Sequence, residues 1–189
     1  DRSPSRGLGD VYKRQAYETE AMQHLLEEAG YEIVPFTQKA DVYVINTCSV
    51  TNMADRKSRQ MLHKAKKNNP DSIVVAAGCY VQTSEKEVLN DLSVDIVIGN
   101  DRKHDLVRLL EEYSLDSVND TVDDINDGKH DFEELFIDQT KEHTRAFIKV
   151  QDGCNQFCSY CIIPYARGRV RSRRLSLIHI SEPTRRTPI

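Results

Sequence analysis

The sequence lacks any long hydrophobic segment. Its 189 residues are 39% hydrophobic and 30% charged, and no apolar run approaches the roughly 18 residues that a membrane-spanning helix requires. The N-terminal residues also lack the apolar core of a secretion signal. Neither a serine–histidine–carboxylate set nor a phosphate-binding P-loop pattern is present. We therefore expect a cytoplasmic globular protein that has no membrane partner and is a monomer.

Excess positive charge is absent too. The net charge is -4, so overall electrostatics gives no argument for nucleic-acid binding. One basic run follows the last cysteine, at Arg167, Arg169, Arg171, Arg173 and Arg174. Such a run can approach RNA phosphates, but a solvated strand edge is the commoner explanation and the one we favour. A second basic set, Arg56, Lys57 and Arg59, is expected to form the solvated face of a helix.

The two ends of the chain carry little structural signal. Residues 1–15, DRSPSRGLGDVYKRQ, show neither helical nor strand periodicity, and residues 175–189, LSLIHISEPTRRTPI, contain one short apolar run. Both resemble translated sequencing-adapter read-through. We expect them to be non-native extensions, with ordinary disordered termini as the alternative, and we assign no function to either.

Helical and strand patterns alternate between these ends. Helices are predicted over residues 17–29, with Gly30 as the stop, over residues 52–67 and over residues 102–113. A further helix is predicted after Ser84, with Glu87 completing a capping box. Strands are predicted over residues 31–34, 41–46, 73–77 and 95–98. This alternation predicts an α/β fold, a doubly wound parallel sheet over residues 16–113.

The composition changes after this predicted domain. Residues 114–143 hold ten acidic residues against two lysines and few apolar residues, which predicts a solvated linker with a possible hairpin at Asp127–Gly128. The segment RAFIKV, residues 145–150, predicts a new strand. A second domain is expected over residues 144–174, cut off near Arg174 and poorly packed after about Arg145.

Two of the five cysteines follow predicted buried strands. An odd number of cysteines without a secretion signal argues against a disulfide framework and for reduced thiols. Cys48 follows DVYVIN and Cys79 follows IVVAA, so both are expected at the carboxyl edge of the sheet, where such folds bind ligands. Thr51 and Asn52 begin a helix whose N-terminus favours a negative cluster. A metal site lacking one ligand is one reading, and buried structural thiols are the other.

The other three cysteines lie in one short loop. DGCNQFCSYC places Cys154, Cys158 and Cys161 in the spacing C-x3-C-x2-C. A structural zinc site has four ligands, whereas three thiolates can hold three irons of a [4Fe–4S] cubane and leave the fourth iron open. Gly153 suits the tight turn before the first ligand. Tyr160 is either a core aromatic or a neighbour of whatever binds the open iron.

These motifs resemble a known family. CNQFCSYC resembles the cluster loop of radical S-adenosylmethionine enzymes. YETEAM, ADVYVINTCSVTNMADRKSRQ, VVAAGCY and FIKVQDGCNQFCSYCIIPYARGRVRSR resemble the methylthiotransferases that modify tRNA. The residues of NTCSVTNMADRKSRQ and YETE are most similar to the branch that acts on threonylcarbamoyladenosine beside the anticodon. The resemblance covers residues 17–173, most of the chain.

The resemblance implies a function and its cofactors. Cys154, Cys158 and Cys161, with Tyr160 nearby, would hold the [4Fe–4S] cluster that binds S-adenosylmethionine and generates a 5′-deoxyadenosyl radical. Cys48 and Cys79 would hold an auxiliary [4Fe–4S] cluster implicated in supplying sulfur. The reaction would add a methylthio group at C2 of the tRNA base, with electrons from a donor such as flavodoxin. The alternatives are the isopentenyladenosine or ribosomal-protein branch, or a non-catalytic metal-binding module.

The sequence departs from the family in three places. Where the family has a third N-terminal cysteine, this chain reads VYKRQA, so the auxiliary cluster is expected to be one ligand short. Most of the radical-SAM (β/α) barrel would be missing after Arg174, and the C-terminal RNA-binding domain is absent. The chain is therefore expected to be a fragment that is inactive on its own.

Overall fold

The computed structural model describes residues 9–49, 51–114, 122–127, 130–133, 135 and 149–176, with the side chains of residues 9–15 and 114 left aside. Its centre is a three-stranded parallel sheet in the order β1-β2-β3. The strands are β1 (Val42–Thr47), β2 (Ile73–Gly78) and β3 (Ile96–Ile98). The parallel α/β architecture predicted from the sequence is confirmed.

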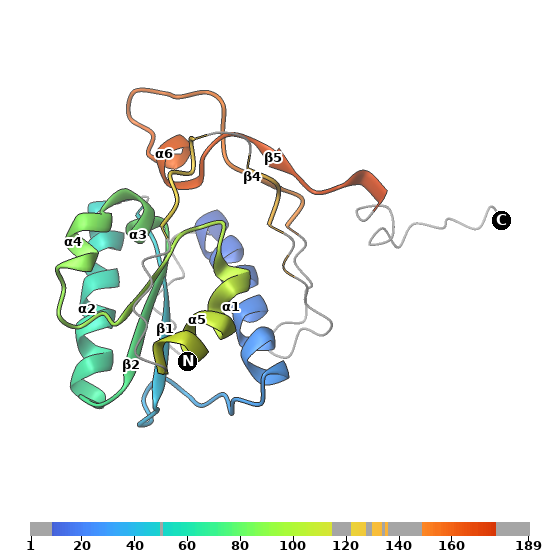
Figure 1. Ribbon diagram of the computed structural model, residues 1–189. Helices are drawn as coiled ribbons and strands as arrows, with labels where there is room; N and C mark the ends of the chain where they lie inside the picture. Colours follow the sequence, from blue (N-terminus) through green and yellow to red (C-terminus); the bar gives the residue numbers. More distant parts are fainter. Residues whose placement is uncertain are drawn as a thin grey trace.

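Helices cover both faces of the sheet. They are α1 (Gly9–Glu28), α2 (Asn52–Asn68), α3 (Cys79–Thr83), α4 (Glu85–Leu89) and α5 (Leu106–Ser114), with a 3-10 turn η1 (Lys103–Asp105) before α5. Figure 1 shows α2 and α4 on one face and α1 and α5 on the other. This three-layer arrangement explains why the strands read as continuous apolar runs, since both of their faces are buried.

Alternate residues of β2 supply two separate cores. Val74 and Ala76 pack toward α2 with Leu62 and Ala65, whereas Val75 and Ala77 pack toward α1 and α5. Burial of these side chains stabilises the domain by about 25 cal/mol per Å² of apolar surface removed from water. Met53 and Met61 of α2 lie outside this core and are 61% and 38% exposed.

Three local predictions are corrected. Residues 31–34 do not form a strand, because no neighbouring strand pairs with them and Tyr31 and Ile33 are exposed. Helix α1 begins at Gly9, within a segment in which the sequence showed no helical periodicity. Ser84 precedes α4 without a side-chain capping bond, and Glu87 instead accepts a hydrogen bond from the Tyr80 hydroxyl at 3.2 Å.

Parts of the acidic segment pack onto the domain. Ile125 and Leu135 are buried, and the hydroxyl of Tyr17 on α1 donates to the Leu135 carbonyl at 2.6 Å. The predicted hairpin at Asp127–Gly128 and most of the predicted strand over residues 145–150 lie outside the described residues. A two-stranded antiparallel sheet follows, β4 (Gln151–Asp152) with β5 (Arg171–Ser172), separated by α6 (Ile163–Arg167). No helix in the described part of the chain is long and apolar enough to span a bilayer.

Candidate functional site

Two cysteines lie at the carboxyl edge of the sheet. Thr47 at the end of β1 is paired in register with Gly78 at the end of β2. Cys48 and Cys79 are the next residues on their strands, Cys48 half-buried and Cys79 2% exposed. Neither cysteine is in a disulfide bond among the described residues. The predicted placement of the two thiols at one edge of adjacent parallel strands is therefore confirmed.

A close backbone contact determines how Cys79 leaves the sheet. Gly78 has φ +101°, and a Cβ at this position would lie 2.5 Å from the carbonyl oxygen of Thr47. Only glycine fits this approach without displacing the backbone of β1. The tight turn lets α3 begin directly at Cys79, so the thiol is held at the strand end and not further along a loop.

The helix after Cys48 begins as predicted. Thr51 is the N-cap of α2, and its hydroxyl accepts a hydrogen bond from the Ala54 amide at 3.1 Å. The Ser58 hydroxyl of α2 accepts from the Cys48 amide at 3.2 Å. The residues after β1 are thereby fixed against the first turns of α2. Arg56, Lys57 and Arg59 are exposed, as expected for a solvated face.

The three-cysteine loop runs from β4 to α6. Gly153 has φ +77°, and a Cβ there would lie 2.1 Å from the carbonyl oxygen of Arg169, so the start of the loop lies tightly against its return strand. The Cys154 amide donates to the Gly168 carbonyl at 3.1 Å, and the Cys161 amide donates to the Cys158 carbonyl at 2.9 Å. The first contact joins the two ends of the loop, next to the predicted tight turn at Gly153, and the second forms a turn between the last two cysteines.

The thiols of this loop differ in exposure. Cys158 is exposed and Cys154 and Cys161 are half-buried. Phe157, before Cys158, has φ +46°, a conformation that non-glycine residues adopt rarely and that reverses the chain here. Tyr160 is 90% exposed, which excludes the core-aromatic alternative. The loop therefore presents its cysteines on an accessible surface.

The chemistry of the donor set indicates which metal group the loop could hold. C-x3-C-x2-C supplies three thiols. A closed zinc site has four ligands. In a cubane each thiolate binds a different iron, so three thiols from one short loop match three of its four irons. Among the described residues, no group of three or more His, Cys, Asp or Glu side chains is placed to hold one metal ion.

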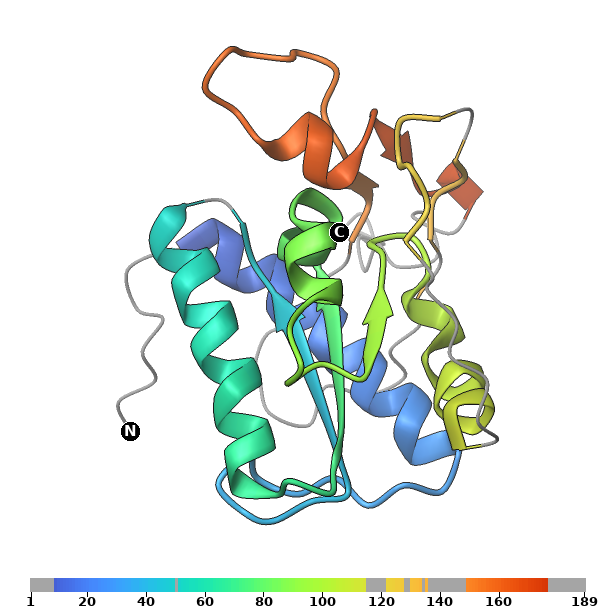
Figure 2. The ribbon, with the colours of Figure 1, turned by 60° about the vertical axis from the view of Figure 1, so that its left-hand side comes forward.

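The helix that follows the three-cysteine loop is packed against the α/β domain. Helix α6 contacts α3, and Pro164, Ala166 and Arg167 are buried. Figures 1 and 2 both show α6 above α3, at the carboxyl edge of the sheet. The Asn126 side chain also donates to the Pro164 carbonyl at 3.2 Å. Our expectation that residues after about Arg145 pack poorly is therefore wrong for α6, whereas residues 155–160 and 174–176 are exposed.

The basic run after the loop is largely not a solvated edge. Arg167 is 3% exposed, and the side chain of Arg171 is 10% exposed, donating to the Arg167 carbonyl at 2.9 Å. Arg169 is exposed, with its guanidinium carbon 5.1 Å from the centre of the Phe157 ring. Alternate arginines therefore face inward, and the solvated-edge prediction is wrong for Arg167 and Arg171.

Buried ion pairs join the loop to the domain, and no periodic pattern in the sequence predicted them. Lys149 Nζ lies 3.0 Å from Glu18 Oε1 and 2.7 Å from Asp152 Oδ2, and Lys103 Nζ lies 2.9 Å from Glu18 Oε2. Burial alone would raise the pKa of Asp152, but Lys149 and Arg167 lower it to about 2. The lowered pKa values of Glu18 and Asp152 and the raised pKa of Lys149 keep these three groups charged at neutral pH, and with Lys103 they form one electrostatic unit.

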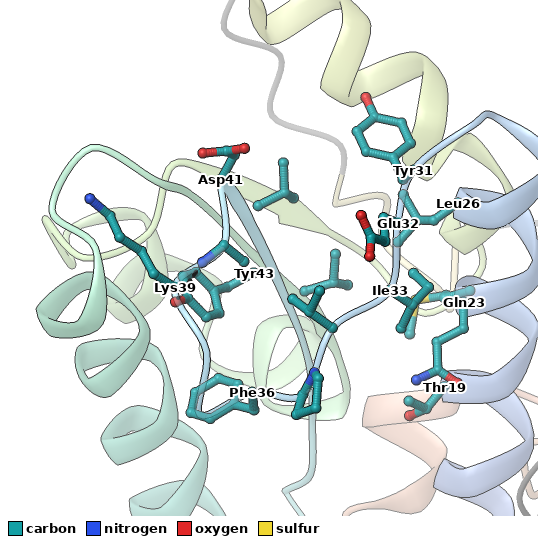
Figure 3. A pocket seen from close by; sticks show the side chains of 16 residues that line it. Thr19, Gln23, Leu26, Tyr31, Glu32, Ile33, Phe36, Lys39, Asp41 and Tyr43 are labelled. Carbon is teal, nitrogen blue, oxygen red and sulfur yellow. Dashed lines mark hydrogen bonds between the residues drawn. The ribbon is translucent and has the colours of Figure 1, made fainter.

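A cavity of about 530 Å³ lies elsewhere, between α1, residues 31–41 and the amino-terminal half of β1. Figure 3 shows Thr19, Gln23 and Leu26 of α1 on one side and Lys39, Asp41 and Tyr43 on the other. None of the five cysteines lines it. The cavity is therefore separate from the thiol-bearing edge.

Known proteins resemble this chain over most of its length. Residues 13–99 match the model of uncharacterized protein family UPF0004. Threonylcarbamoyladenosine tRNA methylthiotransferase MtaB of Bacillus subtilis is 46% identical over 159 residues, 83% of this chain and 35% of that protein. MtaB of Aquifex aeolicus is 44% identical over 164 residues, 86% of this chain and 40% of that protein. The chain belongs to the tRNA methylthiotransferase family.

A second branch of the family matches less closely. The tRNA-2-methylthio-N(6)-dimethylallyladenosine synthase of Moorella thermoacetica is 34% identical over 163 residues, 83% of this chain and 36% of that protein. The identities favour the MtaB branch, as the wording of the motifs predicted. The chain spans well under half the length of these curated relatives.

Proposed function

We propose that this chain provides the N-terminal domain and the cluster-binding loop of a tRNA methylthiotransferase that acts on threonylcarbamoyladenosine. The observation that carries the proposal is the packing of α6, the helix that directly follows the C-x3-C-x2-C loop, on α3 at the sheet edge that bears Cys48 and Cys79. The names of its relatives supply the substrate class. The complete enzyme would act on tRNA in the cytoplasm as a monomer.

In this proposal the loop holds the first cofactor. Cys154, Cys158 and Cys161 would bind three irons of a [4Fe–4S] cluster, and the fourth iron would be left for S-adenosylmethionine. The cluster supplies the electron that cleaves S-adenosylmethionine to a carbon radical. Tyr160, exposed beside Cys161, would cover one side of the bound cofactor. The closed loop ends keep the backbone around the cysteines in one conformation.

The sheet edge would hold a second, auxiliary cluster. Cys48 and Cys79 follow residues paired in register, so the two thiols can serve one ligand group. The third protein ligand expected from the family has no counterpart in VYKRQA, residues 11–16. A further ligand, from an exchangeable thiol or sulfide, would complete this cluster, and a donor such as flavodoxin would reduce both. Residues 149–174 would begin the radical-SAM barrel.

Anaerobic reconstitution of the full chain with iron and sulfide tests the proposal. We expect about four irons per chain that are lost when Cys154, Cys158 and Cys161 are all replaced by Ala. The EPR spectrum of the reduced protein should shift when S-adenosylmethionine is added. The matched control is Cys48→Ala with Cys79→Ala, which should leave this shift in place. Zinc bound in place of iron, or an iron content in the triple variant equal to that of the unaltered chain, would contradict the proposal and favour a structural metal module.

A further inference from the structure

A chain of buried polar contacts runs from α1 to the three-cysteine loop through Asn100. Lys103, 0% exposed, donates to Glu18 Oε2 at 2.9 Å and to Asn100 Oδ1 at 3.0 Å. The side-chain amide nitrogen of Asn100, Nδ2, donates to the Ala166 carbonyl on α6 and lies 3.6 Å from the Cys79 sulfur. The Asn100 side chain thus contacts both the Cys79 thiol and the helix that follows the loop.

A second chain of contacts returns to α1 from the same helix. Arg167 Nη1 lies 3.4 Å from Asp152 Oδ1 and 3.8 Å from Glu18 Oε1, and Lys149 bridges Asp152 and Glu18. Glu18, Lys103, Asn100, Ala166, Arg167, Asp152 and Lys149 therefore form a closed ring, which we call the Glu18 ring.

The Glu18 ring includes residues on both sides of the three-cysteine loop. Asp152 precedes Cys154 by two residues, and Arg167 follows Cys161 by six. Glu18, Asn100 and Lys103 belong to the α/β domain, whereas the other ring members belong to the loop segment. Buried charged hydrogen bonds tolerate little change in geometry, because a displaced partner leaves an unpaired charge away from water. The ring therefore specifies one position of the loop relative to Cys79.

We propose that Arg167 and Asn100 are positioning residues, which hold the three-cysteine loop at a fixed place over Cys79 through the Glu18 ring. The significance of this position rests on the proposed function. The position would place the S-adenosylmethionine site opposite the sheet edge that bears Cys48 and Cys79. The ring itself is a property of the polypeptide. It can therefore be tested without either cluster.

Hydrogen exchange of the full metal-free chain tests the positioning. The probes are the amides of Cys154 and Arg173, which donate to Gly168 and Val150, with the amides of β2 as the internal reference. In Arg167→Gln, exchange at the two loop probes should rise roughly tenfold while β2 is unchanged. Arg169→Gln, an exposed arginine two residues on, is the matched control and should leave both unchanged. Asp152→Asn, an isosteric change, should reproduce the effect of Arg167→Gln.

Three results would overturn the proposal: no change at the loop probes in Arg167→Gln, an equal change in Arg169→Gln, or an equal loss at β2 in both ring variants. The last result would make the ring a stabiliser of the whole fold.

Reconstitution gives a readout that a merely stabilising role would not move. In Arg167→Gln the iron content should stay at the level of the unaltered chain, but the EPR response to S-adenosylmethionine should broaden into more than one species. An unaltered response would count against positioning. If the unaltered chain binds no iron while the exchange result holds, the proposed function fails and the ring stands.

Discussion

Replacing Glu18 by Gln should destabilise the protein more than any other single charge removal on α1. Glu18 is 2% exposed, and its carboxylate oxygens lie 2.9 Å from Lys103 Nζ and 3.0 Å from Lys149 Nζ. The substitution keeps the shape of the side chain but leaves two buried ammonium groups without their shared carboxylate. Breaking one side of a buried ion pair costs about 3–5 kcal/mol. At roughly 2–4 °C per kcal/mol, the melting temperature should fall by about 6–20 °C.

Urea unfolding followed by circular dichroism measures the expected loss in the free energy of unfolding, and a thermal scan measures the fall in melting temperature. The matched control is Glu28→Gln on the same helix, whose partner is His24 at 3.6 Å and whose side chain is 63% exposed. An exposed pair of this kind contributes about 0.3–0.5 kcal/mol. Adding Lys103→Met to Glu18→Gln should recover part of the loss, because it removes one stranded charge. A Glu18→Gln variant within 1 kcal/mol of the control would refute the reasoning.

The pH dependence of the same comparison has a definite sign. Burial alone would raise the pKa of Glu18, but Lys103, Lys149 and Arg167 hold it well below the ordinary value of 4.5. A carboxylate with a depressed folded-state pKa contributes stability above its unfolded pKa and loses it as the pH falls through the folded pKa. The gap between wild type and Glu18→Gln should therefore be constant from pH 6 to 8 and close only in strong acid. A gap that closes near neutrality would contradict the assigned charge state.

Three further outcomes are expected. Gly78→Ala should lower stability by about 2 kcal/mol in thermal unfolding, because its Cβ would meet the Thr47 carbonyl oxygen at 2.5 Å and its φ is +101°; an unchanged melting temperature would contradict the close contact. Thr51→Ala should cost about 1 kcal/mol through the lost N-cap bond, with Thr51→Ser as the near-neutral control in the same urea assay. NMR titration should give His104 a pKa above 6.5, chiefly because it hydrogen-bonds to Glu133, and Glu133→Gln should bring it back. The stability from that contact should be present below pH 6.5 and lost as the pH rises through the folded pKa, and a His104 pKa at or below 6.5 would contradict it.

The buried strands could be predicted because their signal is local. DVYVIN and IVVAA are apolar and β-branched, and both faces of their strands are covered by helices. The stretch at residues 31–34 carries a similar but shorter run, and it has no strand to pair with. Strand formation depends on a neighbour that the local sequence does not specify. This is why YEIV was mistaken for a strand.

The elements missed by sequence reasoning are short or depend on tertiary contacts. Helix α3 has only five residues, so it shows less than two turns of periodicity. It exists because Gly78 turns the chain sharply and because α6 packs on it. The Ser84 capping box failed because Tyr80, one turn of chain away on α3, takes the Glu87 carboxylate. Propensity predicted a helix there, and packing decided its capping.

The candidate site divides in the same way. The positions of Cys48 and Cys79 follow from a general rule, since parallel strands bring their carboxyl ends to one edge. The docking of the three-cysteine loop follows from no such rule. The Glu18 ring joins residues 85 and 131 positions apart in the chain, and each of its charged members, taken alone, is of a type that is usually exposed. Five charged side chains gather in the interior only because each finds a partner there. Because Arg167 is a buried member of the ring, it has a structural role and is not available to contact RNA. A search for RNA-binding residues in this segment should therefore begin with the exposed Arg169 and Arg174.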